Sequence, residues 1–134
     1  MKTNKLIYRI WLGLFSLAII GAVVNSILNY DTVALTFEKL GYPAYLIHVL
    51  GAAQIVGLIL IISNKDHWYV EWVYAGFFMN FTLGCIAHLA TNHGNGASAV
   101  FCLMLLWVTY IHSKKVRVSN KETENVIKPK PEYA

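Results

Sequence analysis

The sequence predicts an all-α fold: a polytopic membrane protein built as a bundle of four transmembrane helices, followed by a disordered basic C-terminal tail. Of the 134 residues, 57% are hydrophobic and only 13% are charged, whereas a soluble domain carries about a quarter charged residues. A soluble domain of this length could not bury so much apolar surface in one core. The apolar residues also fall into four runs, and the basic residues lie mainly at the two ends. These observations predict a chain that lies almost entirely within the bilayer.

The first predicted helix covers residues 6–28. Lys2, Lys5 and Arg9 stand at its start, as basic residues do at the start of a secretory signal. The apolar run nevertheless continues to Leu28 without a small-x-small cleavage site, and three further runs follow. Because about 20 apolar residues are enough to cross a hydrocarbon core, we expect this run to be a retained membrane helix.

The connection over residues 29–44 mixes apolar with polar side chains, which predicts a short amphipathic segment on the membrane surface. Its apolar members are Val33, Leu35, Phe37 and Leu40. Pro43 precedes the second predicted helix, residues 45–62, and at a helix start the missing N–H of proline costs little.

The third predicted helix covers residues 70–90 and the fourth covers residues 97–112. The short segments 63–69 and 91–96 between the runs are predicted to be turns. No proline falls within a run, and a helix satisfies its own backbone hydrogen bonds in lipid. Residues 113–134 are polar and charged, which predicts a disordered tail.

Charge and aromatic residues predict the orientation of the transmembrane domain, residues 1–112. Of the eleven Lys and Arg residues, three precede residue 10 and six follow residue 113, and an even number of spans places both ends on one side. The positive-inside rule makes that side the cytoplasm. The tryptophans fall near the same interface, while tyrosines mark the opposite one; the tryptophans are Trp11, Trp68, Trp72 and Trp107.

The net charge of +4 and the pI of about 9.1 do not indicate nucleic-acid binding, because a solvated basic patch beside stacking aromatic residues is missing. The expected partner is the lipid bilayer. Lys114, Lys115 and Arg117 follow the last span, where they are placed to contact anionic lipid. Glu71 begins the third helix, where an acidic residue is favoured by the helix dipole, so a capping role is predicted.

Polar side chains inside the spans are the strongest functional signal, because they are costly in lipid. At a rise of about 1.5 Å per residue, Gln54 and Asn80 lie within roughly 3 Å of the midplane, His48 about 7 Å and Asn25 and His88 about 12 Å toward the outside. These residues therefore predict a polar wedge that opens outward, which we interpret as a candidate ligand-binding site. The alternative is that they only pack and hydrogen-bond between helices.

Histidine in such a wedge can relay protons, donate a hydrogen bond to a carbonyl ligand or bind a metal. Because the histidines are dispersed and no HxxxH or CxxC motif occurs, no metal site is predicted. Cys85 and Cys102 are nearly symmetric about residues 93–94, so a helical hairpin places them at similar depth. They are either a redox pair or ordinary small packing residues. No catalytic triad, nucleotide-binding loop or catalytic residue is identified.

Three segments carry a resemblance to a known family: LGYPAYL at 40–46, EWVYAGFFMNF at 71–81 and AHL at 87–89. With the four spans, they resemble the DoxX-like family of small bacterial membrane proteins over about residues 6–112.

The chain departs from the family pattern at two places. Relatives often carry a lysine where this chain has Gln54. They also tend to have Gly-Asp soon after the histidine that matches His88, whereas here Asn92, His93 and Gly94 follow. A mechanism that needs a buried lysine is therefore not expected in this protein.

The resemblance implies a four-helix bundle in the bacterial inner membrane and leaves several functions open. The family is named for a subunit of a thiosulfate:quinone oxidoreductase, so one hypothesis is an accessory or subunit of a quinone-linked redox system. His88 and Asn80 would then contact a quinone carbonyl, with Gln54 or His48 assisting. A second hypothesis is a structural or assembly partner, in a membrane redox complex or a homo-oligomer. A third, a small transporter, is disfavoured because no Asp or Glu lies deep in a span. Fold analogy alone assigns no chemistry.

Overall fold

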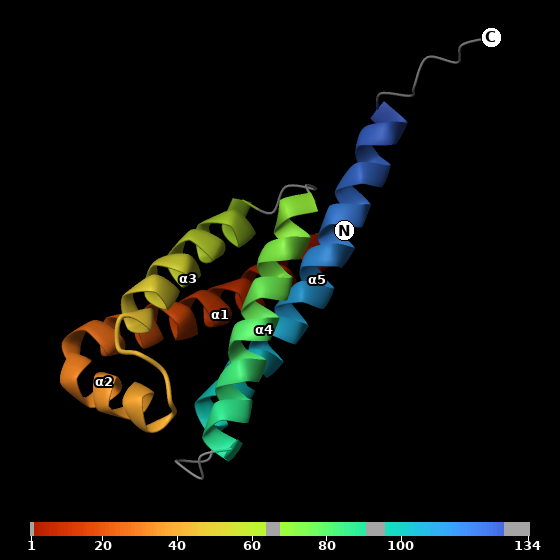
Figure 1. Ribbon diagram of the computed structural model, residues 1–134. Helices are drawn as coiled ribbons and strands as arrows, with labels where there is room; N and C mark the ends of the chain where they lie inside the picture. Colours follow the sequence, from red (N-terminus) through yellow and green to blue (C-terminus); the bar gives the residue numbers. More distant parts are fainter. Residues whose placement is uncertain (1, 64–67, 91–95, 128–134) are drawn as a thin grey trace.

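The computed structural model describes residues 2–63, 68–90 and 96–127, and this part of the chain is all-helical. Five helices follow one another (Figure 1): α1 (Lys2–Leu28), α2 (Tyr30–Lys39), α3 (Leu46–Ser63), α4 (Trp68–Ala90) and α5 (Ala97–Ile127). Every helix except α2 is long and apolar enough to cross a membrane. The predicted all-α fold with four spanning helices is confirmed.

The four spanning helices alternate in direction, so the bundle has two different ends. At the terminal end α1 begins, α3 ends, α4 begins and α5 leaves the bundle (Figure 1). At the α2 end, α1 passes into α2, and α4 approaches the start of α5. α1 packs against α3 and α5, and α4 packs against α3 and α5. α2 contacts only α1 and α3 among the described helices.

An aromatic cluster joins α1 to α4 in the middle of the bundle. Phe15 packs edge-to-face with Phe77 and with Phe81 at centroid distances of 5.3 and 6.5 Å, while Phe77 and Phe81 stack at 5.8 Å. Edge-to-face and offset-stacked rings are the favoured arrangements of aromatic pairs. Buried aliphatic residues from α1, α3 and α5 surround the cluster, namely Ile19, Leu58, Ile61, Leu105 and Leu106.

α3 reaches this cluster through Gly57. A Cβ atom at Gly57 would lie 2.8 Å from Cε2 of Phe77 and 3.2 Å from Cγ1 of Val73, which is closer than packed atoms approach one another. Only a residue without a side chain lets α3 lie this close to α4. Small residues serve the same purpose at helix contacts throughout membrane proteins.

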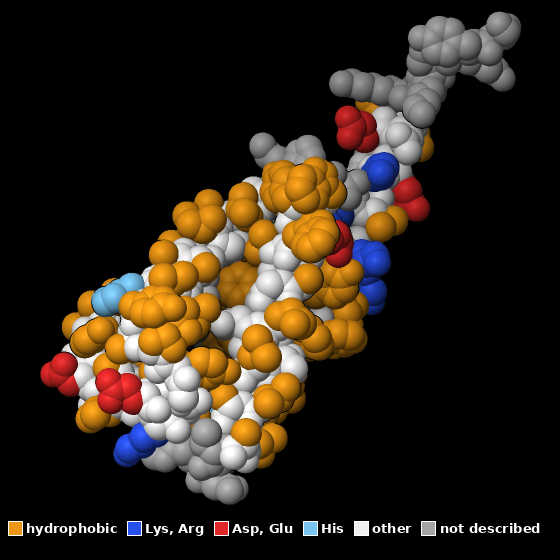
Figure 2. Space-filling view, in the orientation of Figure 1, with side chains coloured by type: hydrophobic (Ala, Val, Ile, Leu, Met, Phe, Trp, Pro, Cys, Tyr) orange, Lys and Arg blue, Asp and Glu red, His pale blue; other side chains and the backbone are white. Residues whose placement is uncertain are grey.

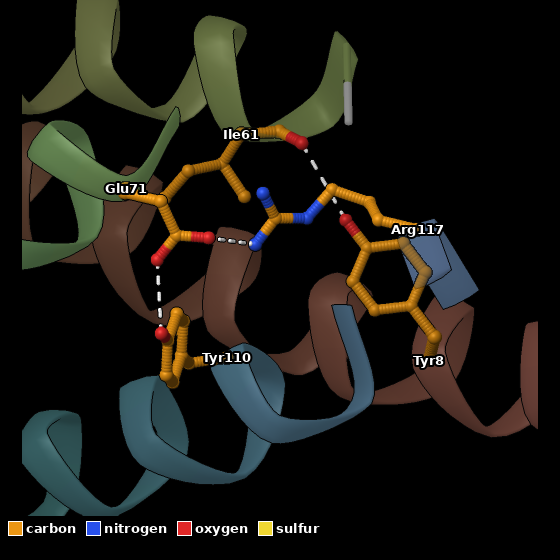
Figure 3. A network of polar contacts seen from close by, with 5 residues as sticks. All are labelled: Tyr8, Ile61, Glu71, Tyr110 and Arg117. Carbon is orange, nitrogen blue, oxygen red and sulfur yellow. Dashed lines mark hydrogen bonds and ion pairs between the residues drawn. The ribbon is translucent and has the colours of Figure 1, made fainter. Parts of the chain in front are cut away.

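Polar contacts tie the helices together at the terminal end (Figure 3). Nη2 of Arg117 donates to Oε1 of Glu71 at 2.5 Å, and the hydroxyl of Tyr110 donates to Oε2 of the same carboxylate at 2.9 Å. The hydroxyl of Tyr8 donates to the carbonyl oxygen of Ile61 at 3.4 Å. The first two contacts join α4 to α5, and the third joins α1 to α3. Glu71 thus does more than cap α4, the only role predicted for it from the sequence.

The last helix extends further than the sequence predicts. The predicted helix stopped at residue 112 and a disordered tail followed, whereas α5 continues to Ile127. The reason is that Ser113, Val116 and Arg117 recur at helical spacing and are buried against the bundle. The 31 residues of α5 measure about 46 Å, so the helix is longer than a hydrocarbon core of about 30 Å is thick. Residues 128–134 lie outside the described residues.

The other boundaries agree with the predictions to within a few residues. α1 starts at Lys2 instead of residue 6, and α4 starts at Trp68 instead of residue 70. The amphipathic segment predicted within 29–44 contains α2, and Gly41 follows it with a φ of 81°, a conformation that glycine adopts without strain. Most of the two predicted turns, residues 64–67 and 91–95, lies outside the described residues.

The first prediction concerns the contact of α3 with α4. Gly57→Ala forces a methyl group against the buried Phe77 ring, so we expect it to lower the free energy of unfolding by about 1–3 kcal/mol, as overpacking does. Thermal unfolding of the purified protein in detergent measures this. Gly76→Ala is the matched control, because nothing lies within 4 Å of its added methyl group. Equal losses for the two variants would contradict the close approach.

The second prediction concerns the ion pair. Glu71→Gln leaves the charge of Arg117, whose side chain is 4% exposed, without its partner. We expect a loss of about 1–3 kcal/mol, less than for a fully buried pair, because Glu71 is 43% exposed. Arg117→Met added to Glu71→Gln should recover part of the loss, since it removes the unpaired charge. Glu38→Gln, at an exposed acid on α2, is the control; if it costs as much as Glu71→Gln, the pair is not a specific contact.

Candidate functional site

A cavity of about 430 Å³ lies in the half of the bundle nearer the α2 end. All five helices line it, and its volume falls within the range of about 300–1,000 Å³ that is usual for small-molecule sites. Most of its wall is apolar. The polar or sulfur-bearing lining residues are Ser26, Tyr42, Gln54, Asn80, His88, Ser98 and Cys102.

The cavity exists because α3 and α4 touch at Gly57 and leave space between them toward the α2 end. Phe81, the outer member of the aromatic cluster, forms its floor. Two lining glycines, Gly51 and Gly84, add no side chain to fill the space. Added Cβ atoms there would meet Val23 and Ala99 only at 3.8 and 3.7 Å, which is ordinary contact. Methyl groups at these two positions would therefore fit without displacing Val23 or Ala99.

The structure brings together three of the five predicted site residues. Gln54 from α3 and Asn80 and His88 from α4 line the cavity. They share it because each helix presents one face to it: Ile47, Leu50, Gly51 and Gln54 on α3, and Asn80, Gly84 and His88 on α4.

The other two predicted residues lie on the outside of the bundle. Asn25 is exposed on α1, where its Oδ1 accepts a hydrogen bond from Nδ2 of Asn29 at 2.9 Å. His48 is exposed on α3 and stacks on the ring of Tyr30, with the ring centroids 5.1 Å apart. Neither residue lines the cavity. That any of the five binds a ligand stays a prediction.

Several lining residues were not singled out from the sequence. Ser26 and Ser98 are small polar residues whose positions become informative only once α1 and α5 are packed. Phe37 and Tyr42, whose ring centroids lie 6.2 Å apart, cover the α2 end of the cavity. The apolar pattern of residues 29–44 indicated only that Phe37 belongs to an amphipathic segment.

The two cysteines have different surroundings. Both thiols are free, but Cys102 lines the cavity and Cys85 is not among the lining residues. Within the described ranges, no group of three or more His, Cys, Asp or Glu side chains could hold a metal ion. The side chains of Gln54, Asn80 and His88 offer hydrogen bonds to a molecule in the cavity.

The lining residues define which ligands the cavity suits. None of those in the described part of the chain is Asp, Glu, Lys or Arg. The amides of Gln54 and Asn80 can each donate and accept hydrogen bonds, and His88 can do either. Apolar walls with a few converging polar groups are typical of sites for small lipophilic molecules.

The cavity is separated from the polar contacts at the terminal end. Phe15, Phe77 and Phe81 lie between the two regions, and beyond them Tyr74 packs against Tyr110 with ring centroids 5.1 Å apart. These buried rings thus separate the cavity from the polar contacts at the terminal end.

Comparison with known protein families identifies the family to which the chain is similar. The chain matches the model of the DoxX-like family over residues 10–110. This stretch includes every residue that lines the cavity. Neither the curated proteins nor the solved structures that were compared gave a match.

Proposed function

We propose that the cavity binds a neutral, lipophilic molecule with carbonyl groups, of the quinone class. The chain belongs to the DoxX-like family and is a multi-pass integral membrane protein. The protein would serve as an accessory or subunit of a quinone-linked membrane redox system. The observation that carries the proposal is the convergence of Gln54, Asn80 and His88 on a cavity whose described lining has no charged side chain.

The side chains that can hydrogen-bond to a ligand are spread along the cavity, which supports a ligand with two separate carbonyl groups. A quinone is a flat apolar ring with two carbonyl oxygens at opposite edges, so it needs donors at two places and apolar walls between them. Asn80 and His88 lie eight residues apart on α4, which separates their Cα atoms by about 12 Å along the helix. Gln54 faces the cavity from α3. Phe81 and Phe37 supply aromatic walls at its two ends.

A second candidate function is that of a structural or assembly partner, and the extension of α5 favours it. This helix projects beyond the other spans at the terminal end (Figure 1) and exposes Val118, Val126 and Ile127. Removal of residues 118–134 should abolish co-purification of a partner protein if assembly is the function. The same truncation should leave quinone binding unchanged.

The proposed location is the inner membrane of a bacterium, with both chain ends in the cytoplasm. The exposed basic residues Lys114 and Lys115 lie near the terminal end, as do the exposed side chains of Trp68 and Trp72. Basic residues favour the cytoplasmic side, and tryptophan favours the interface.

The third prediction concerns which end of the bundle faces the cytoplasm. A green fluorescent protein fused after residue 134 should fluoresce, because it folds in the cytoplasm, and an alkaline phosphatase fused at the same place should be inactive. A phosphatase fused within the connection 91–95 should be active. The opposite pattern would place the α2 end in the cytoplasm.

The fourth prediction concerns the binding of a quinone in the cavity. The wild-type protein in lipid nanodiscs should bind a short-chain ubiquinone or menaquinone saturably. Asn80→Leu and His88→Leu should each weaken binding roughly three- to tenfold, because one neutral hydrogen bond contributes about 0.5–1.5 kcal/mol and 1.4 kcal/mol is tenfold. Equilibrium binding with a radiolabelled quinone measures this.

The chain supplies matched controls for both substitutions. Asn25→Leu and His48→Leu make the same chemical changes on the outer surface, so they should leave binding within about twofold of wild type. If the wild type shows no saturable binding, or if the controls lose as much as the cavity variants, the proposed site is wrong.

A further inference from the structure

We infer that the cavity opens sideways into the bilayer between α3 and α4, and that its ligand carries an apolar tail that leaves through this opening beside Leu83. This inference rests on the proposed function and adds to it the class of ligand, a ring with a prenyl or alkyl chain, and the route by which the ligand reaches the cavity.

The proposed opening lies beside Leu83. Leu83 lines the cavity and is also 49% exposed, so the cavity reaches the outer surface of α4 at this residue. Leu50 of α3, half-buried, lines the opposite side. Hydrophobic side chains cover much of the outer faces of α3 and α4 (Figure 2).

The proposed opening lies within α4, away from the end of the helix. Leu83 lies seven residues before the end of α4 at Ala90, so it is about 10 Å from the α2 end of that helix. The outer faces of α3 and α4 expose large apolar side chains, among them Val49, Val56, Met79 and Ile86. An exposed apolar band on a spanning helix faces hydrocarbon. The opening therefore meets lipid chains.

Side chains cover the cavity at the α2 end. Phe37, Leu40 and Tyr42 lie over the cavity there, so a water-borne molecule arriving along the membrane normal meets bulky, mainly apolar side chains. A molecule already dissolved in the bilayer reaches the opening beside Leu83 without crossing them. This arrangement selects a ligand that partitions into lipid.

The residues that line the cavity and its opening indicate the shape of the ligand. The hydrogen-bonding groups of Gln54, Asn80 and His88 are inside, while the opening is bordered by Leu50 and Leu83. A molecule with a polar ring and an apolar tail satisfies both regions at once, with the ring among the amides and the tail between the leucines. The cavity of about 430 Å³ then holds the ring and the first part of the tail, and the remainder lies in the bilayer.

The experiment compares two ligands on the full chain in nanodiscs: a tail-less dimethoxy-methyl-benzoquinone and the same ring with two isoprene units. Leu83→Trp narrows the opening. We expect it to weaken binding of the tailed ring at least about tenfold and to change binding of the tail-less ring less than about twofold. Leu89→Trp, at a more exposed leucine of α4 outside the cavity lining, should change neither. Comparing variants with the same ligand cancels the partitioning of that ligand into lipid.

The outcomes separate this inference from the proposed function. If wild type binds both rings and Leu83→Trp affects them equally or not at all, the tail does not leave beside Leu83, while the quinone site stands. Binding of the tail-less ring alone overturns the inference in the same way. Absence of binding for both rings overturns both proposals. Leu50→Trp repeats the test from α3, with the same expected loss for the tailed ring, should Leu83→Trp not fold.

Discussion

The contact of Gly57 with the ring of Phe77 is the constraint on which the rest of the bundle depends. In a bilayer the hydrophobic effect does not press helices together, so their association relies on close van der Waals packing. Gly57 lets α3 approach the ring, and Phe77 packs in turn against Phe15 of α1 and Phe81 of α4. Because this contact lies in the half of the bundle nearer the terminal end, that half is closed and the other half is free to open.

The two halves consequently carry different chemistry. At the terminal end, the charge of Arg117 is compensated by Glu71, and the tyrosine hydroxyl of Tyr110 completes the carboxylate's contacts. A buried charge without such a partner is strongly destabilising. At the α2 end, the cavity has neutral amides and an imidazole in its wall. The groups that hold α4 to α5 are thus distinct from those proposed to bind a ligand.

Hydropathy predicted the four spans well because apolar length is the physical requirement for crossing a bilayer. It failed at the end of α5, since a polar composition concealed the helical spacing of Ser113, Val116 and Arg117, which are buried by contacts with other helices. For the candidate site, the rise per residue predicted depths but no directions. Gln54, Asn80 and His88 face the cavity, whereas Asn25 and His48 face outward. Which face of a helix is covered depends on its neighbours, and one sequence read helix by helix does not contain that information.

The identity of residue 54 connects the packing to the proposed ligand. The side chain at this position is an amide, where the resemblance to the DoxX-like family implies a lysine. Since none of the described lining residues is a carboxylate, a lysine in this cavity would bring a charge without a partner, at a depth where such a charge is expensive. Gln54 keeps the ability to donate a hydrogen bond and adds the ability to accept one. It therefore suits a ligand that presents carbonyl oxygens in one state and hydroxyl groups in another, as a quinone and its quinol do.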